Sequence, residues 1–259
     1  MKLPIYQVDA FAGRRFAGNP AAVCPLERWL GDDVMQSIAE ENNLAETAFT
    51  VKRGDEYEIR WFTPTVEIDL CGHATLATAW VVFERLEPGR GPITFHSRSG
   101  PLMVRRDGDR LALDFPADEG APCEPPPGLA EALGLAPRET HCARYVMAVL
   151  ASEDQVRNLT PDMSRVAALE ARALIVTAPG RDVDFVSRFF APRLGVPEDP
   201  VTGSAHCILV PYWARRLNKT RLHALQLSPR GGELWCEMAG TRVILAGHGV
   251  PYLEGTIEV

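Results

Sequence analysis

The chain has 259 residues, of which 46% are hydrophobic and 24% charged, and its formal net charge is −7. This composition is typical of a globular protein with one large domain or two ordinary ones. The absence of a Lys/Arg block argues against a nucleic-acid surface, and no apolar run approaches the roughly 20 residues needed to span a membrane.

The N-terminal segment "MKLPIYQVDAF" is too short and too polar for a signal peptide, so we expect it to form the first strand of a cytoplasmic protein. The six cysteines form no C-x-x-C pair, and we expect all of them to be reduced thiols. Grouped Cys/His ligands are absent, which argues against a zinc site, and no P-loop or Rossmann glycine motif occurs.

The first half of the chain alternates strand and helix patterns. Strands are predicted at 3–11 and 21–26, followed by a helix over "GDDVMQSIAEENN" and a hairpin over "ETAFTVKRGDEYEIRWFTP". A long apolar helix is then predicted from about 73 to 86. Three further strands, 92–98, 101–106 and 109–115, follow it.

A proline-rich segment separates the two halves. Residues 116–128, "PADEGAPCEPPPG", hold five prolines, as stiff linkers do. We therefore predict domains at 1–116 and 117–249, with the option that the last strand, about 250–259, returns to the first domain. The second half repeats the strand pattern and contains another long apolar helix, "SAHCILVPYWARRLN".

The two halves share a weak internal repeat. "RWFTP" followed by "CGHATLATAWVVF" in the first half matches "RFFAP" followed by "TGSAHCILVPYW" in the second, with a shift of three residues between the two motifs. We predict an α+β protein with two similar domains, each a barrel-like, mostly antiparallel sheet around a central helix. If both helix starts open on one cleft, their free N–H groups form a cage for an anion, and Gly72 and Gly203 allow close approach.

Four segments together resemble a known family. "VDAFAGRRFAGNPAAV", "NNLAETAF", "FTPTVEIDLCGHATLA" and "EDPVTGSAH", in this order, resemble the phenazine-biosynthesis PhzF-like family, whose fold is similar to that of diaminopimelate epimerase. The resemblance implies an isomerase that moves a proton on a small carboxylate in the cleft between two domains. It also implies a homodimer with no cofactor and no metal. The named family member isomerises dihydro-hydroxyanthranilate.

The resemblance also implies roles for single residues. Glu46 matches the acid/base of the family motif, and His73 and Asp199 match its helper residues. Ser204 matches a residue at the second helix start, and Asn19 lies near the site. Without the family, Glu46 reads as a solvent-side strand residue, Asp199 as the opening of a turn and Ser204 as a helix cap.

At the positive end of a helix, an isolated His73 is expected to be neutral. Two alternatives stay open. An epimerase could use Cys71, although the second helix start has no matching cysteine because Cys207 lies about a turn too far into the helix. A non-catalytic protein could bind a small carboxylate in the same place. A role in phenazine synthesis itself would be a further and weaker step.

Overall fold

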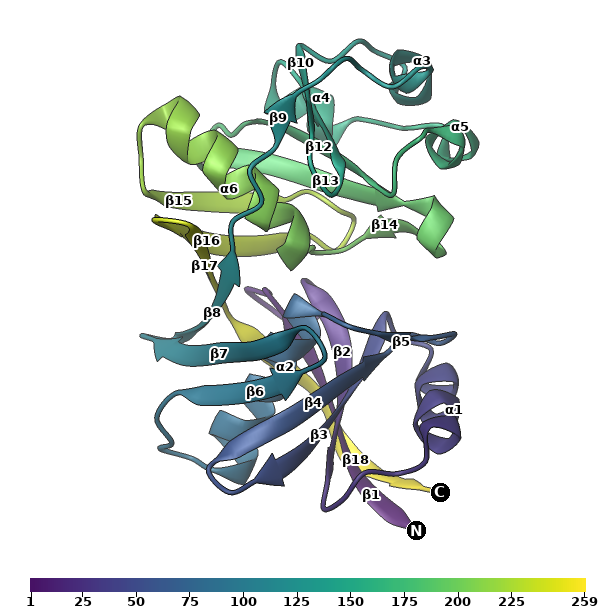
Figure 1. Ribbon diagram of the computed structural model, residues 1–259, viewed down its shortest axis with the longest axis vertical. Helices are drawn as coiled ribbons and strands as arrows, with labels where there is room; N and C mark the ends of the chain where they lie inside the picture. The colour runs from purple at the N-terminus through teal and green to yellow at the C-terminus, as the bar shows by residue number, and fades with distance from the viewer. The chain divides into compact units, whose positions relative to one another are not determined.

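The computed structural model describes residues 1–259, which divide into two compact units (Figure 1). Unit 1 contains residues 1–114 and 246–259, and unit 2 contains residues 115–245. The sequence placed the first boundary two residues later, at 116. The last strand, β18 (Gly249–Glu258), pairs antiparallel with the first, β1 (Lys2–Ala10), and so belongs to unit 1.

The other elements of unit 1 follow in chain order. They are β2 (Asn19–Leu26), α1 (Asp32–Asn42), β3 (Glu46–Arg53), β4 (Glu56–Phe62), β5 (Glu67–Ile68), α2 (Gly72–Val81), its π-helical extension η1 (Val82–Leu86), β6 (Ile93–Ser97), β7 (Gly100–Asp107) and β8 (Arg110–Pro116).

Unit 2 contains β9 (Ala121–Pro122), α3 (Leu129–Leu133), β10 (Glu139–Cys142), β11 (Val146–Val149), α4 (Glu153–Arg157), α5 (Met163–Ala168), β12 (Leu174–Pro179), β13 (Phe185–Ala191), the 3₁₀ turn η2 (Pro192–Leu194), β14 (Val196–Asp199), α6 (Gly203–Leu217), β15 (Arg221–Gln226), β16 (Gly232–Ala239) and β17 (Arg242–Gly247). The last two residues of β8 fall in unit 2, and the last two of β17 fall in unit 1. Helix α6 continues through Pro211.

Both units are built on one pairing scheme, which confirms the predicted repeat. In unit 1, β1–β2 is antiparallel, β2–β3 parallel, β3–β4 antiparallel, and β4–β6 parallel, with α2 in the crossover. In unit 2, β10–β11, β11–β12, β12–β13 and β13–β15 follow the same sequence of directions, with α6 in the crossover. The fold is therefore α+β and mostly antiparallel, as predicted.

A bidentate Arg–Glu ion pair joins corresponding strands in the two units. Arg60 on β4 binds Glu67 on β5 through two hydrogen bonds of 2.7 Å, and Arg188 on β13 binds Glu198 on β14 at 2.7 and 2.9 Å. The partners are seven positions apart in unit 1 and ten in unit 2, where η2 lies between them. These three additional residues explain the shift of three between the matching sequence motifs.

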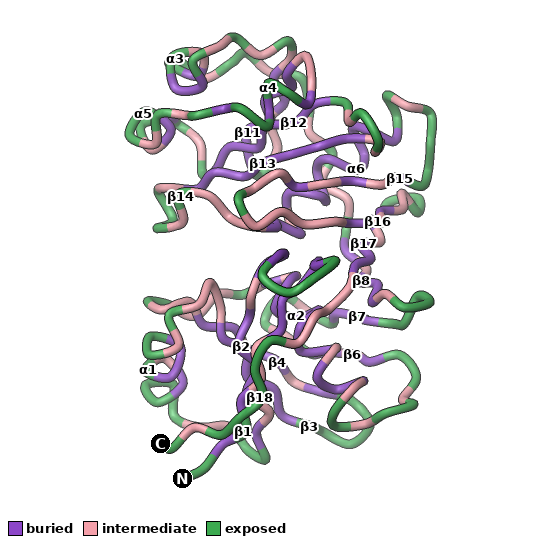
Figure 2. Tube along the Cα trace, turned by 180° about the vertical axis from the view of Figure 1, so that it is seen from behind, coloured by how far each residue is buried: buried purple, intermediate pink, exposed green.

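The central helix of unit 1 is buried on nearly all sides and packs on β1, β2 and β3 (Figure 2). Apart from His73 and Trp80, its side chains are small or aliphatic, so the sheet can wrap closely around it. Thr75 and Thr78 are also buried, and their hydroxyls donate hydrogen bonds to the carbonyls of Cys71 and Ala74. No buried hydroxyl of this helix is therefore left without a partner.

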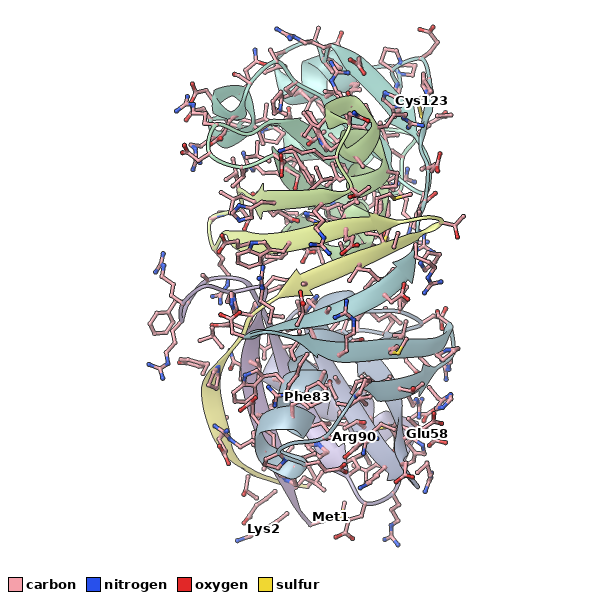
Figure 3. All side chains as sticks on the ribbon, turned by 90° about the vertical axis from the view of Figure 1, so that its left-hand side faces the viewer. Met1, Lys2, Glu58, Phe83, Arg90 and Cys123 are labelled. Carbon is pink, nitrogen blue, oxygen red and sulfur yellow. A yellow bond between two sulfur atoms is a disulfide. The ribbon has the colours of Figure 1, made fainter.

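One expectation about the cysteines is wrong. Cys123 and Cys142 form a disulfide within unit 2, with Cα atoms 5.8 Å apart (Figure 3 labels Cys123). The pairing of β9 with β10 sets Ala121 opposite Cys142 and so brings the two cysteines together, which their spacing in the sequence did not reveal. The other four cysteines are free and buried. None of the helices has the length and hydropathy that crossing a membrane requires.

Candidate active site

Three elements of unit 1 place the predicted residues side by side. Asn19 begins β2, Glu46 begins β3, and Cys71 precedes the first turn of α2, which contains Gly72 and His73. Strands β2 and β3 run parallel with Ala21 opposite Glu46, so their starts lie side by side, at the edge of the sheet that is formed by strand ends. The start of α2 reaches the same edge because the helix packs across these strands.

The side chains at this edge are in direct contact. His73 Nε2 lies 3.0 Å from Glu46 Oε2, and its Nδ1 lies 3.2 Å from the Asn19 amide nitrogen and 3.5 Å from Cys71 Sγ. The side chain of His73 is 7% exposed and that of Glu46 16%, so solvent reaches the cluster mainly at the carboxylate. The structure therefore brings together Glu46, His73 and Asn19, as the family resemblance implied.

The contact between Glu46 and His73 does not have the geometry of a hydrogen bond. Glu46 Oε2 and His73 Nε2 are buried atoms that make no well-formed hydrogen bond, although they lie at ion-pair distance. Buried polar atoms without a hydrogen-bond partner are costly and uncommon. The Glu46–His73 contact is therefore an ion pair with poor hydrogen-bond geometry, which a substrate group can replace.

The expectation of a neutral His73 is wrong. Burial disfavours the imidazolium, but the Glu46 carboxylate beside the ring outweighs that effect, and the pKa of His73 lies well above its usual value. The contact with the carboxylate, about 27 residues away in the sequence, thus overrides the positive end of the helix. Burial and the Glu46 charge raise the pKa of the Cys71 thiol, so the sulfur is protonated near neutral pH.

The predicted residues of unit 2 lie at the start of α6. Thr202 precedes the helix and donates a hydrogen bond from its hydroxyl to Asp199 Oδ2. Ser204 Oγ lies 3.1 Å from the hydroxyl of Tyr145. Buried Gln226 accepts a 2.9 Å hydrogen bond from the Thr202 amide and donates a 2.8 Å bond to the Asp199 carbonyl.

Sequence reasoning missed Tyr145, Thr202 and Gln226 in this network. Tyr145 and Gln226 lie on other elements, and no local motif marks them. Thr202 stands inside the motif "EDPVTGSAH", so its position directly before the helix could have indicated a role. Asp199 and Ser204 share this helix start, whereas Glu46 and His73 belong to the other unit. A single cleft between the helix starts stays a prediction.

The two helices do not supply a pair of reactive thiols. Cys207 Sγ lies inside α6, 3.6 Å from the Gly203 carbonyl, and burial raises its pKa to about 12. Cys71 also has a raised pKa. Because the thiolate is the reactive form of cysteine, this chemistry argues against the Cys71 epimerase.

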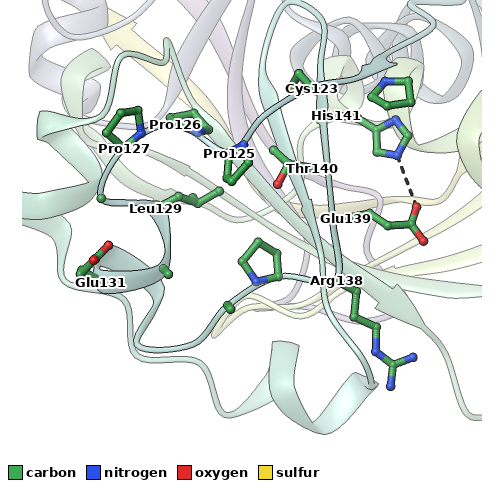
Figure 4. A pocket seen from close by; sticks show the side chains of 15 residues that line it. Cys123, Pro125, Pro126, Pro127, Leu129, Glu131, Arg138, Glu139, Thr140 and His141 are labelled. Carbon is green, nitrogen blue, oxygen red and sulfur yellow. Dashed lines mark hydrogen bonds and ion pairs between the residues drawn. The ribbon is translucent and has the colours of Figure 1, made fainter.

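A pocket of about 680 Å³ lies in unit 2, between the proline-rich segment and β10 (Figure 4). None of the predicted site residues lines it. Its Glu139 carboxylate already accepts hydrogen bonds from Tyr212 and Arg216, and His141 lies 3.4 Å away. We therefore place the candidate site at the Glu46 cluster, where the predicted residues meet.

Comparisons with known proteins identify the family of the chain. The model of the family described as "Phenazine biosynthesis-like protein" matches residues 8–255. This chain belongs to that family. An uncharacterized isomerase of Pseudomonas aeruginosa is 53% identical over 259 residues, and all of both chains is covered.

Solved structures support the family and the fold. A PhzF family protein of Enterococcus faecalis has 50% identity and a TM-score of 0.98, with both chains fully covered. A hydroxyproline epimerase of Agrobacterium vitis has a TM-score of 0.62 but only 10% identity, over 99% of this chain and 92% of its own, so it shows the fold alone. The chain is thus an enzyme of the PhzF-like isomerase family, as the sequence motifs indicated.

Proposed function

We propose that this PhzF-like protein moves a proton on a small carboxylate substrate without a cofactor, with Glu46 as general acid/base. The observation that supports it best is the pair of buried, adjacent and unaligned atoms, Glu46 Oε2 and His73 Nε2. A catalytic acid or base needs a reactive atom that no other protein group occupies. Glu46 is also the more exposed of the two side chains, so a substrate can reach it.

The proposed reaction has two proton transfers. The Glu46 carboxylate takes a proton from one carbon of the substrate, and the electron pair left behind is delocalised into the carboxylate or a conjugated double bond. The protonated Glu46 then returns the proton to another carbon, or to the same carbon. Protonated His73 stays beside it and stabilises the negative charge that develops on the substrate.

The helix starts are proposed to bind the anionic groups of the substrate. The first amides of α2, at Gly72 and His73, and those of α6, at Gly203 and Ser204, have no partners within their helices. Such N–H groups and the positive end of the helix dipole favour a carboxylate. Asp199 is proposed to orient the substrate, and its bond to Thr202 fixes the carboxylate position. A cytoplasmic homodimer remains part of the proposal.

Deuterium exchange tests the proposal across a whole class of candidate substrates. A panel of small carboxylic acids, each with a C–H next to the carboxylate or to a conjugated double bond, is incubated with the enzyme in D₂O and analysed by mass spectrometry. Loss of the general acid/base in Glu46→Gln is expected to slow deuterium uptake about 10²–10⁴-fold. The exposed Glu56 on the neighbouring strand supplies the control, and Glu56→Gln should keep the wild-type rate.

Three results would contradict the proposal. Full exchange activity in Glu46→Gln would remove Glu46 from the reaction, and inactivation by thiol alkylation alone would favour the Cys71 epimerase. A carboxylate that binds to the wild-type protein, while no acid of the panel takes up deuterium, would favour a non-catalytic binding protein.

A further inference from the structure

We infer that Glu46, Cys71 and His73 form a binding site for a divalent cation of the zinc class, and that the cation competes with the substrate for these residues. Their ligand atoms, a carboxylate oxygen, a thiol sulfur and an imidazole nitrogen, all lie within 4.8 Å of one another. Zinc binds such groups at about 2.0–2.3 Å, so tetrahedral ligand atoms stand about 3.3–3.8 Å apart. The cluster needs only small side-chain shifts to reach that geometry.

The orientation of the side chains supports convergence on a common partner. Glu46 Oε2 and His73 Nε2 are 3.0 Å apart without a well-aligned hydrogen bond, so a cation that displaces the His73 proton can bind both atoms. The Asn19 amide lies 3.2 Å from the other ring nitrogen of His73.

The ligand chemistry selects the cation. A sulfur ligand is soft, so Cys71 favours zinc over magnesium or calcium, which prefer oxygen ligands. Cation binding displaces the protons of Cys71 and of His73 Nε2, and the thiolate and the carboxylate then balance the two positive charges of the ion. Because Cys71 stands directly before helix α2, the first N–H groups of the helix stabilise the thiolate.

Three protein ligands leave a fourth position open, the arrangement found in catalytic zinc sites. In this protein, however, the cation would occupy the reactive atoms of Glu46 and His73. The expected consequence is inhibition, and this part of the inference rests on the proposed function. Binding of the cation itself does not depend on it.

Cobalt(II) tests binding without any substrate, because a thiolate bound to cobalt gives a charge-transfer band in the near ultraviolet. The untagged full-length protein is titrated with Co²⁺, which Zn²⁺ should then displace. We expect the band in the wild type and its loss in Cys71→Ser, with zinc affinity lowered more than about tenfold. Glu46→Gln should keep the band but bind zinc more weakly.

The matched control is Cys24, a free and fully buried thiol of the same unit that packs in a separate hydrophobic cluster. Cys24→Ala should keep both the band and the zinc affinity. Circular dichroism checks the fold of each variant, and Cys71→Ala replaces Cys71→Ser if the latter does not fold. Absence of the band in the wild type, or its persistence without Cys71, would overturn the inference.

A second readout separates this inference from the proposed function. Zn²⁺ should slow deuterium uptake by any substrate found in the panel, and a chelator should restore it. If the cobalt band appears but no acid exchanges its protons, the metal site stands and the proposed function fails. If exchange occurs and the band does not appear, the proposed function stands and the metal site fails.

Discussion

The starts of the two central helices occupy equivalent places in the repeat, but the pKa values of the buried histidines near them are shifted in opposite directions. At α2, buried His73 lies against a carboxylate, and its pKa is well above its usual value. At α6, buried His206 donates its Nδ1 proton to the Thr202 carbonyl, and burial lowers its pKa to about 4. The repeat therefore conserves the position of the helix, while contacts with other elements decide what chemistry its start can perform.

The polar groups at the two starts also differ in hydrogen bonding. Around α6, Gln226 and Tyr145 bond to Thr202 and Ser204, which holds the helix start in one arrangement. Around α2, Glu46 and His73 form an ion pair without a well-aligned hydrogen bond. A fixed network suits binding and positioning, whereas an unaligned acid/base pair suits proton transfer.

Among changes that compare the two helix starts, the largest expected effect comes from replacing His73 by glutamine, with His206→Gln as its counterpart. His73→Gln removes the positive charge beside Glu46, so deuterium uptake should fall by about 10²-fold or more. His206→Gln should keep the exchange rate but lower the free energy of unfolding by about 1–3 kcal/mol, because a buried hydrogen bond is disturbed. Equal losses of exchange in both variants would show that the two starts are not chemically distinct.

The disulfide distinguishes the units in another way, because it lies only in unit 2. It joins cysteines 19 positions apart. A cross-link of this span restricts the unfolded chain, so its loss should lower the free energy of unfolding by about 3 kcal/mol. Cys123→Ala should therefore weaken hydrogen-exchange protection around β10, while protection of β1 in unit 1 stays unchanged. Unaltered protection of β10 would mean that strand pairing alone holds this segment.

The pH dependence of stability should have opposite signs at the two histidines. The raised pKa of His73 stabilises the folded state at pH values below its unfolded-state pKa, and this contribution is lost as pH rises through the folded-state value. The lowered pKa of His206 has no effect above about pH 6.5, but it destabilises the folded state as pH falls towards 4, by up to about 3 kcal/mol.

Urea unfolding from pH 4 to 9, in the presence of a chelator, measures both effects as differences between the wild type and each His→Gln variant. The difference for His73→Gln should shrink as pH rises, and that for His206→Gln should shrink or reverse as pH falls. Parallel curves for the two variants would contradict the opposite pKa shifts.

The smallest expected effect concerns the hydroxyl of Tyr145. Tyr145→Phe removes its bond to Ser204 but keeps the ring packed against Phe189, so the free energy of unfolding should fall by about 0.5–1.5 kcal/mol. If Ser204 binds substrate, KM should change more than kcat. A fall in kcat alone would assign the hydroxyl to the chemical step instead.

Much of the fold and of the candidate site was predictable from the sequence. The apolar helices, the turns and the repeated "RWF" and "RFF" segments are local patterns, and in the structure each Arg stacks on the Phe two positions later. Glu46, His73 and Asp199 each lie in a motif that is one continuous stretch of sequence. The family and the candidate residues could therefore be identified without coordinates.

Only the tertiary structure decided the state of these residues. The protonation of His73, the position of Cys71 beside it, the Cys123–Cys142 disulfide and the bonds of Gln226 depend on contacts between segments far apart in the chain. A residue's charge and reactivity follow from desolvation and from its nearest partners, and both are set when the sheet closes around the helix. The sequence by itself determined which groups are present and where the central helices begin, and the folded chain determined which groups meet there.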